Sequence, residues 1–300
     1  MTRISLTILA AAAIMAAALG SGCQKTVSTD LTSTKTAVDR PESPINADAF
    51  LDIARFHASF STTSTKIDGS PVAGVVNHHA LASDLLTGFF RTLSKSRPDI
   101  RRIIILSPDH YKRGTDAISV GSFDYTTQGK LVRVDQEAVS ALAEAGAGRG
   151  SRDLFVHEHG VAALVPFLAR EFDSVVIVPI TIRVDIGRER ASEFGETLRS
   201  LIDEHTFVVI SADMSHYLRE DVALKNDVST EDWLRRFDAD AIGKANDDFT
   251  DNGPSFVTLF RLLEKMNVKP TFQKLDHSIS SRYGGDKLYT TSYITGIWTK

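Results

Sequence analysis

The chain has 300 residues, of which 42% are hydrophobic, and a formal net charge of −4. That length and apolar content suffice for one large globular domain or two small ones. Lysine and arginine are scattered rather than gathered in a basic stripe, which argues against nucleic acid as a partner.

The first residues have the layout of a bacterial secretory signal. Arg3 is followed by an apolar run from Ile4 to Leu19 and then by small residues before Cys23. The run is short for a membrane span, and polar sequence follows it. The layout also resembles a lipoprotein signal, although Leu19 precedes the cysteine by four residues instead of three. We therefore predict a signal peptide over residues 1–22 and an exported protein, on the periplasmic or cell-surface side, whose membrane contact is a lipid anchor on Cys23. Ordinary secretion with an unmodified cysteine is the alternative.

Cys23 is the only cysteine of the chain, so the mature fold contains no intramolecular disulfide. The domain itself then has no thiol to serve as nucleophile or metal ligand. Residues 23–45 are rich in Ser, Thr, Asp and Pro and lack periodicity, which is typical of a flexible tether. We predict a single domain over residues 46–300.

Beyond the tether, apolar strands and amphipathic helices alternate. The predicted strands cover residues 72–76, 102–106, 117–120, 174–181 and 207–211, and residues 289–298 are typical of an antiparallel strand. The predicted helices cover residues 81–93, 135–145, 161–172, 188–203, 230–245 and 255–265. Continuous apolar strands separated by helices predict an α/β fold with a mostly parallel central sheet and helices on both faces.

Polar residues follow three of the predicted strands. His78 and His79 come after the first, the segment Ser107–Tyr111 after the second, and the segment Ser211–Tyr217 after residues 207–210. In open α/β sheets, ligands bind where the carboxyl ends of the strands converge. Three such placements indicate a site at this edge of the sheet.

Histidines of this kind are candidate metal ligands. A neutral imidazole offers one nitrogen to a metal while an acceptor orients the other. Two histidines and a carboxylate form a ligand face that suits non-haem Fe(II), and zinc hydrolases use similar sets. His79 and His110 are the candidate first two ligands, and we expect His78 to be a structural neighbour. The third ligand should be a carboxylate or another histidine.

Two further pairs could serve the same site. Asp213 and His216 lie three residues apart and could form an acid–base pair or supply two more ligands, while Asp213 could instead cap the following turn. The segment His157–Gly160 does not match the HExxH zinc motif, because Val161 stands where the second histidine is needed. Glu158 and His159 are candidates for lining a cleft.

Several short motifs, in their order along the chain, resemble the Memo family. They read "GVVNHHAL", "RRIIILSPDHY", "HEHGVAALVPFL", "VVISADMSHYL" and "DHSISSRYGGDKLYTTSYITGIW" and cover roughly residues 70–300. Bacterial and archaeal members of this family are called AmmeMemoRadiSam system protein B. The resemblance implies a fold similar to that of class III extradiol dioxygenases, with a metal site at one edge of the sheet.

The resemblance also implies site residues. The histidine of the family's Pro-His-Ala-Gly corresponds to His79, with His78 at its proline, and the histidine of Gly-Pro-Ser-His corresponds to His110. The family's third ligand is usually a cysteine, and Asp251 stands closest to that position, whereas alignment on the following Gly-Pro would select Thr250.

The remaining family motifs extend the site beyond the metal ligands. The family's Asp-x-x-His is matched by Asp213 and His216, and its glutamate–histidine pair is matched by Glu158 and His159. In this interpretation His216 acts as the acid–base residue, and Asp213 orients it or supports the metal.

The resemblance leads to one main functional hypothesis and two alternatives. The main one is a dioxygenase-type metalloenzyme with Fe(II) held by His79, His110 and Asp251, because a hard carboxylate replaces a soft thiolate; copper or zinc are the other candidate metals. The first alternative is a lipoprotein that binds a metal, a small molecule or a peptide without turnover. The second is a zinc-dependent hydrolase.

Overall fold

A mixed sheet of eleven strands runs through residues 42–300, the part of the chain that the computed structural model describes. The predicted signal peptide, Cys23 and nearly all of the predicted tether lie outside the described residues. The sheet order is β1-β5-β6-β8-β3-β9-β2-β11-β10, and β4 pairs with β8 and β7. The strands are β1 (Ile45–Asn46), β2 (Pro71–Val76), β3 (Arg102–Pro108), β4 (Ile118–Val120), β5 (Tyr125–Thr127), β6 (Lys130–Val134), β7 (Gly148–Arg149), β8 (Val176–Ile182), β9 (Thr206–Ser211), β10 (Thr271–Ile279) and β11 (Ser292–Thr299).

The centre of the sheet is parallel, as predicted. Strands β6, β8, β3, β9 and β2 run in the same direction, while β11 and β10 extend the sheet antiparallel from β2. Strands β8, β3, β9 and β2 are almost wholly buried because their β-branched runs are apolar on both faces. The carboxyl ends of β3, β9 and β2 therefore lie side by side at one edge.

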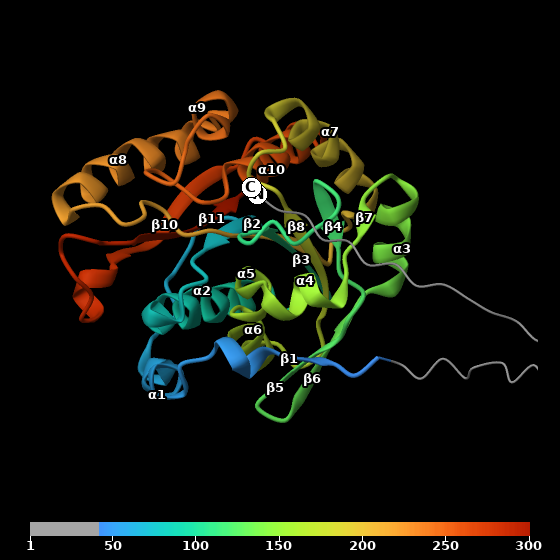
Figure 1. The fold of residues 1–300 in the computed structure, drawn as a ribbon, viewed down its shortest axis with the longest axis horizontal. Coiled ribbons are helices and arrows are strands. Elements are labelled where there is room, and N and C mark those ends of the chain that lie inside the picture. The colour runs from blue at the N-terminus through green and yellow to red at the C-terminus, as the bar shows by residue number, and fades with distance from the viewer. Residues whose placement is uncertain (1–41) are drawn as a thin grey trace, which may run out of the picture. The chain divides into compact units, whose positions relative to one another are not determined.

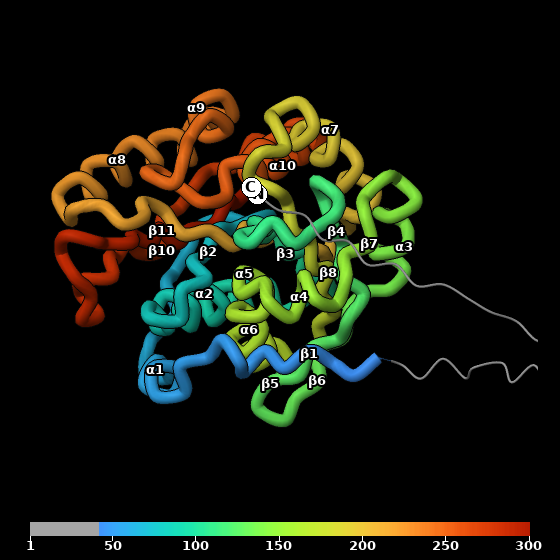
Figure 2. The backbone as a smooth tube through the Cα atoms, viewed as in Figure 1, coloured from blue at the N-terminus to red at the C-terminus, as the bar shows by residue number. Residues whose placement is uncertain are grey.

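Helices cover both faces of this sheet (Figure 1). Helices α7 to α10 lie on one side, and α1, α2 and α4 to α6 lie on the other, an arrangement that the backbone tube also shows (Figure 2). The helices are α1 (Ile53–Ala58), α2 (Ser83–Ser96), α3 (Gln136–Glu144), α4 (Arg152–His157), α5 (His159–Ala162), α6 (Val165–Glu171), α7 (Arg188–Leu198), α8 (Glu220–Arg236), α9 (Ala239–Gly243) and α10 (Gly253–Lys265).

Helix α2 packs unusually closely on β2, and this contact places the loop between them. A Cβ atom on Gly74 would lie 2.6 Å from the ring of Phe89, so the ring rests directly on the strand backbone. Phe89 is fully buried together with Phe90 and Leu93 of the same helix. The apolar face of α2 thus holds the chain that leaves β2 at Val76, where the histidine pair begins.

Helices α1 and α4 were not predicted, and two of the predicted helices are divided differently in the structure. The predicted helix over residues 161–172 is divided into α5 and α6, and Pro166 stands in the first turn of α6, where its missing N–H costs nothing. The predicted helix over residues 230–245 begins earlier, at Glu220, and ends where Phe237 adopts a left-handed conformation with φ of 56°. Asp238 then caps α9 by accepting a hydrogen bond from Ala241 N at 2.9 Å.

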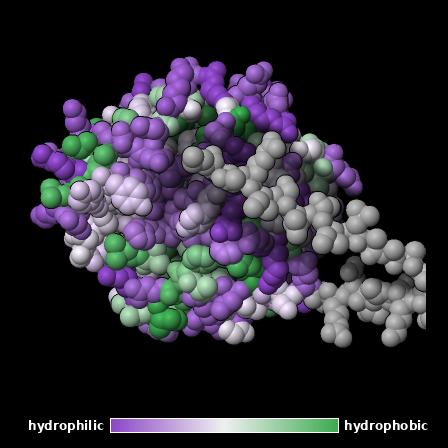
Figure 3. Space-filling view, in the orientation of Figure 1, coloured by the Kyte–Doolittle hydropathy of each residue, from purple (hydrophilic) through white to green (hydrophobic). Residues whose placement is uncertain are grey.

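The face in view is largely hydrophilic, with scattered hydrophobic residues (Figure 3). Within residues 42–300, no helix combines the length and apolar character that a membrane span requires.

Candidate metal centre

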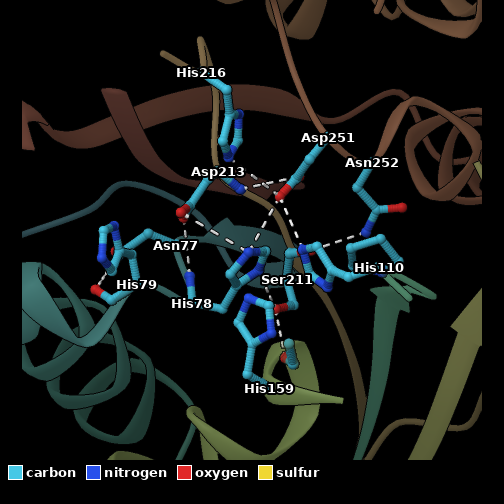
Figure 4. A network of polar contacts seen from close by, with 12 residues as sticks. Asn77, His78, His79, His110, His159, Ser211, Asp213, His216, Asp251 and Asn252 are labelled. Carbon is cyan, nitrogen blue, oxygen red and sulfur yellow. Dashed lines mark hydrogen bonds and ion pairs between the residues drawn. The ribbon is translucent and has the colours of Figure 1, made fainter. Parts of the chain in front are cut away.

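Side chains from five segments meet at the carboxyl edge of the parallel sheet (Figure 4). His78 follows β2, His110 follows β3, and His159 begins α5. His216 comes from the segment after β9, and Asp251 lies just before α10. The strand order β3-β9-β2 brings these segments together although they are far apart in the sequence.

The carboxylate of Asp251 is the point on which the imidazoles converge. Its Oδ2 atom lies 3.1 Å from Nε2 of His78, 3.4 Å from Nε2 of His110 and 3.8 Å from Nε2 of His216. Its Oδ1 atom accepts a hydrogen bond from Asp213 N at 3.1 Å, which fixes the orientation of the carboxylate. One carboxylate oxygen therefore faces three ring nitrogens.

Glu158 orients the ring of His110. Its Oε1 lies 2.7 Å from Nδ1 of His110, and its Oε2 accepts a hydrogen bond from the His110 backbone N–H at 3.0 Å. Oε1 also accepts a hydrogen bond from Gly160 N at 2.8 Å. Because a carboxylate oxygen accepts, Nδ1 of His110 donates to Glu158, and Nε2 is the nitrogen that faces Asp251.

The rings of His78 and His216 are held in the same manner. Nδ1 of His78 lies 3.0 Å from Oγ of Ser211, and Nδ1 of His216 donates to the carbonyl of Met214 at 2.6 Å. The backbone N–H of His78 donates to Oδ1 of Asp213 at 3.1 Å. In each ring the Nδ1 atom faces a fixed partner, so the Nε2 atom is the one that faces the cluster.

His159 completes a group of three imidazoles. Its ring stacks on that of His110, with centroids 4.1 Å apart, and meets the ring of His78 edge to face at 4.9 Å. One ring nitrogen from each of these three histidines lies within 4.8 Å of the other two, a spacing that suits a shared metal ion. Burial and the neighbouring His78 and His110 lower the pKa of His159 to about 2, so this ring is neutral and retains a free lone pair.

The electrostatics of the cluster favour a positive charge beside Asp251. Burial alone would lower the pKa of His110, but hydrogen bonds to Asp251 and Glu158 outweigh it and raise the pKa to about 10. Burial would also lower the pKa of His78, yet the carboxylates of Asp213 and Asp251 raise it. The same two imidazoles hold the pKa of Asp251 well below its usual range despite its burial. Without a metal, protons occupy the positions where a cation would be attracted.

The two adjacent histidines are placed differently from the sequence prediction. His79, chosen there as a ligand, is exposed, and its Nδ1 lies 2.7 Å from the hydroxyl of the buried Tyr293, away from Asp251 (Figure 4). His78, expected to be the structural neighbour, is buried and faces Asp251. Neighbouring residues of an extended segment point to opposite sides, so only one of the two enters the cluster. If the family's Pro-His were aligned with Asn77-His78 instead, the sequence would point to His78.

The structure also shows the contacts of two other predicted residues, Thr250 and Asp213. Thr250 donates its hydroxyl hydrogen to the carbonyl of Asp213 at 3.1 Å, so Asp251, and not Thr250, presents its side chain to the histidines. The carboxylate of Asp213 receives the backbone of His78, whereas the carbonyl of Met214 orients His216. Asp213 therefore supports His78, and the expected direct pairing with His216 is replaced by a backbone contact.

A cavity of about 660 Å³ opens over the cluster. Besides the candidate ligands, its walls include His79, Tyr111, Lys112, Tyr217 and Asp247. Nitrogen and oxygen donors on one side of an open cavity match the ligand set of a divalent cation that keeps a position free for substrate. The donor set at this site thus fits a metal ion.

Known proteins share sequence similarity with most of this chain. The family model described as Memo-like protein matches residues 64–297. A MEMO1 family protein of Saccharolobus islandicus is 26% identical over 233 residues, which are 75% of this chain and 79% of that protein. A MEMO1 family protein of Thermotoga petrophila is 26% identical over 234 residues, covering 76% and 80%.

Among solved structures, the Escherichia coli K12 protein described as uncharacterized protein JW3007 is 15% identical, with a TM-score of 0.47 over 74% of this chain and 98% of that one. The family match spans most of the chain, including every histidine of the cluster. This chain is a member of the Memo family.

Proposed function

We propose that the cluster binds a divalent metal through Nε2 of His78, Nε2 of His110 and the carboxylate of Asp251, and that the protein is a dioxygenase-type metalloenzyme. One observation carries the proposal: two imidazole nitrogens face the same buried carboxylate oxygen at 3.1 and 3.4 Å. Each of these rings has its other nitrogen bonded to a partner, as metal-ligating histidines do. His159 is a candidate fourth ligand.

The donor set favours Fe(II). Two imidazoles and one carboxylate are the ligands of non-haem iron oxygenases, and the absence of a thiolate removes the donor that most favours softer metals. Zinc and copper remain candidates because imidazole suits all three metals. A bound iron would supply Lewis acidity and oxygen chemistry at this site.

His216 is the residue best placed to hold and move a proton. Its Nδ1 is bonded to the Met214 carbonyl, so Nε2 is the nitrogen available for exchange with a substrate hydroxyl. His216 lines the cavity and lies 3.8 Å from Oδ2 of Asp251. A substrate bound beside the metal would thus meet an acid–base group held by the backbone.

The proposal is tested by metal analysis and by oxygen uptake. Protein purified without added metal is reconstituted anaerobically with Fe(II), and oxygen consumption is recorded with a panel of catecholic compounds. We expect about one metal ion per chain and oxygen uptake that depends on substrate. The Asp251→Asn variant, which keeps the shape of the side chain but removes its charge, should lose both. Wild-type protein without stoichiometric metal would refute the metal site.

The same experiment separates the alternatives. Metal uptake without oxygen consumption across the panel would support a binding protein for a metal, a small molecule or a peptide. Zinc as the metal retained on purification, together with ester or amide hydrolysis, would support a hydrolase. Both outcomes keep the metal centre and reject the dioxygenase reaction.

We also propose that the protein is exported and lipid-anchored through Cys23, which lies outside the described residues. The support is the signal-like layout of residues 1–22 and the position of Cys23 as the sole cysteine. Labelling with a radioactive fatty acid in a bacterial host should mark the wild-type chain and spare the Cys23→Ser variant. Equal labelling of both chains, or of neither, would reject the anchor.

A further inference from the structure

We infer that Ser211 is a positioning residue that sets which nitrogen of His78 faces the metal site and, with Asn252, ties the candidate ligands together. The metal-binding part of this inference rests on the proposed function. Ser211 is the last residue of β9, and both its hydroxyl and its carbonyl are buried among the segments that carry the ligands.

The hydroxyl of Ser211 has two partners with different requirements. Its Oγ atom lies 2.5 Å from the carbonyl oxygen of Gly160 and 3.0 Å from Nδ1 of His78. A carbonyl oxygen only accepts, so the single hydroxyl hydrogen of Ser211 points to Gly160. The serine oxygen must then accept a hydrogen bond from Nδ1–H of His78. Nδ1 is thereby held by the serine, and Nε2 is the atom that faces Asp251 and the proposed metal.

The same hydrogen bond reaches a second histidine. Gly160 directly follows His159 and donates its N–H to Glu158, the residue that orients His110. Through Gly160, Ser211 therefore holds the start of α5 against the end of β9.

Asn252 connects this arrangement to the carboxylate. Its Nδ2 atom donates to the carbonyl of Ser211 at 2.8 Å and to the carbonyl of Leu106 at 3.3 Å. The first contact lies on β9 and the second on β3, the strand that leads to His110. Asn252 is fully buried and adjacent to Asp251. Its two hydrogen bonds therefore fix the position of Asp251 relative to the ends of β3 and β9.

The test compares the variant Ser211→Ala with a control variant, Ser107→Ala. Ser107 is equally buried and lies near the end of β3, but its hydroxyl donates to the carbonyl of Pro108 and contacts no candidate ligand nitrogen. Ser107→Ala therefore controls for the loss of a buried hydroxyl at this edge. Ser211→Thr keeps the hydroxyl and serves as the rescue variant.

The first readout needs no metal. Nitrogen NMR of the histidine rings reports whether Nδ1 of His78 carries a hydrogen that is held in a hydrogen bond. We expect a hydrogen-bonded Nδ1–H for His78 in the wild type, in Ser107→Ala and in Ser211→Thr, and loss of that bond in Ser211→Ala, seen as faster exchange of the Nδ1 hydrogen with water. An unchanged His78 spectrum in Ser211→Ala would overturn the inference, even if the protein folds normally.

The second readout is zinc affinity, measured by competition with a chromophoric chelator. Loss of a residue that orients a ligand typically weakens metal binding about 10–100-fold, and we expect this loss in Ser211→Ala but not in Ser107→Ala. Asn252→Asp, which removes the two N–H donors at nearly constant volume, should weaken zinc similarly. Equal affinities of Ser211→Ala and Ser107→Ala would overturn the positioning role. A wild type that takes up no zinc would count against the metal site, and the Nδ1–H readout would still decide the role of Ser211.

Discussion

Nε2 of His78 lies 3.1 Å from Oδ2 of Asp251, and both side chains are buried although 173 positions separate them (251 − 78). An isolated carboxylate in such a place would be costly, and it is stabilised here by imidazoles that carry or attract positive charge. This contact defines the centre of the site and leads to the first predictions.

The two adjacent histidines should differ sharply in metal binding. His78→Ala removes a proposed ligand, so its metal affinity should fall by more than the roughly 10–100-fold expected for a supporting residue. His79→Ala removes an exposed ring bonded to Tyr293 and should leave metal content unchanged. Stoichiometry by elemental analysis of both variants distinguishes them. Metal loss in His79→Ala with retention in His78→Ala would reverse the assignment.

A thiolate at position 251 should change the choice of metal. Asp251→Cys replaces a hard oxygen donor with a soft sulfur donor, which favours zinc or copper over iron. Asp251→Asn should weaken every divalent metal because the charge is lost. Competition titrations with Fe(II) and Zn(II) on the three proteins measure this shift. If Asp251→Cys retained the wild-type preference, position 251 would not contribute a ligand.

The metal-free protein should lose stability as pH rises. The pKa of His110 is raised to about 10 in the folded state from 6.5, and that of His78 is raised as well. A raised pKa adds stability that is complete below the unfolded value and disappears as pH rises through the folded one. We therefore expect the melting temperature of metal-free protein to decrease between pH 6.5 and about 10. Asp251→Asn, which removes the partner of both rings, should flatten this dependence.

Metal affinity should change with pH in the opposite direction. A metal must displace the protons held by His78 and His110, so binding releases protons and strengthens as pH rises. Zinc titrations at several pH values in weakly coordinating buffer give the number of protons released. A pH-independent affinity over the range in which His110 titrates would show that this ring is not displaced by the metal.

Two glycine substitutions should have opposite effects on stability. In Gly160→Ala the new Cβ would meet Ser107 Oγ at 2.3 Å, and such overpacking typically destabilises by about 1–3 kcal/mol. In Gly88→Ala, within α2, the nearest atom would be Thr62 Cγ2 at an ordinary 3.4 Å. Alanine at a helical site without steric conflict typically stabilises by roughly 0.5–1 kcal/mol. Chemical denaturation of the two variants and the wild type measures both effects.

Much of the sheet could be predicted from local sequence. The runs that form β2, β3, β8 and β9 are apolar and β-branched, a pattern sufficient to indicate buried parallel strands. The hairpin of β5 and β6 was not predicted. Residues on β6 alternate between exposed and buried positions, which is a weaker signal than a continuous apolar run.

Two residues that support the site, Ser211 and Asn252, could not be identified from the sequence. Ser211 and Asn252 are ordinary polar residues in the sequence, and their roles arise from bonds to Gly160, Leu106 and each other. These partners come from separate segments of the chain, and no local pattern records that they meet. Asp251 was selected through a family resemblance, not through any spacing within its own segment.

The sequence by itself determined that imidazoles and carboxylates follow predicted parallel strands, because strand periodicity and residue type are local properties. Only the tertiary structure decided which histidine of the 78–79 pair faces Asp251. That choice depends on the bond from His78 N to Asp213 and on the contact between His79 and Tyr293, partners 135 and 214 residues away. The direction of a side chain beyond a strand end is set by such distant hydrogen bonds, which exist only once the sheet has formed.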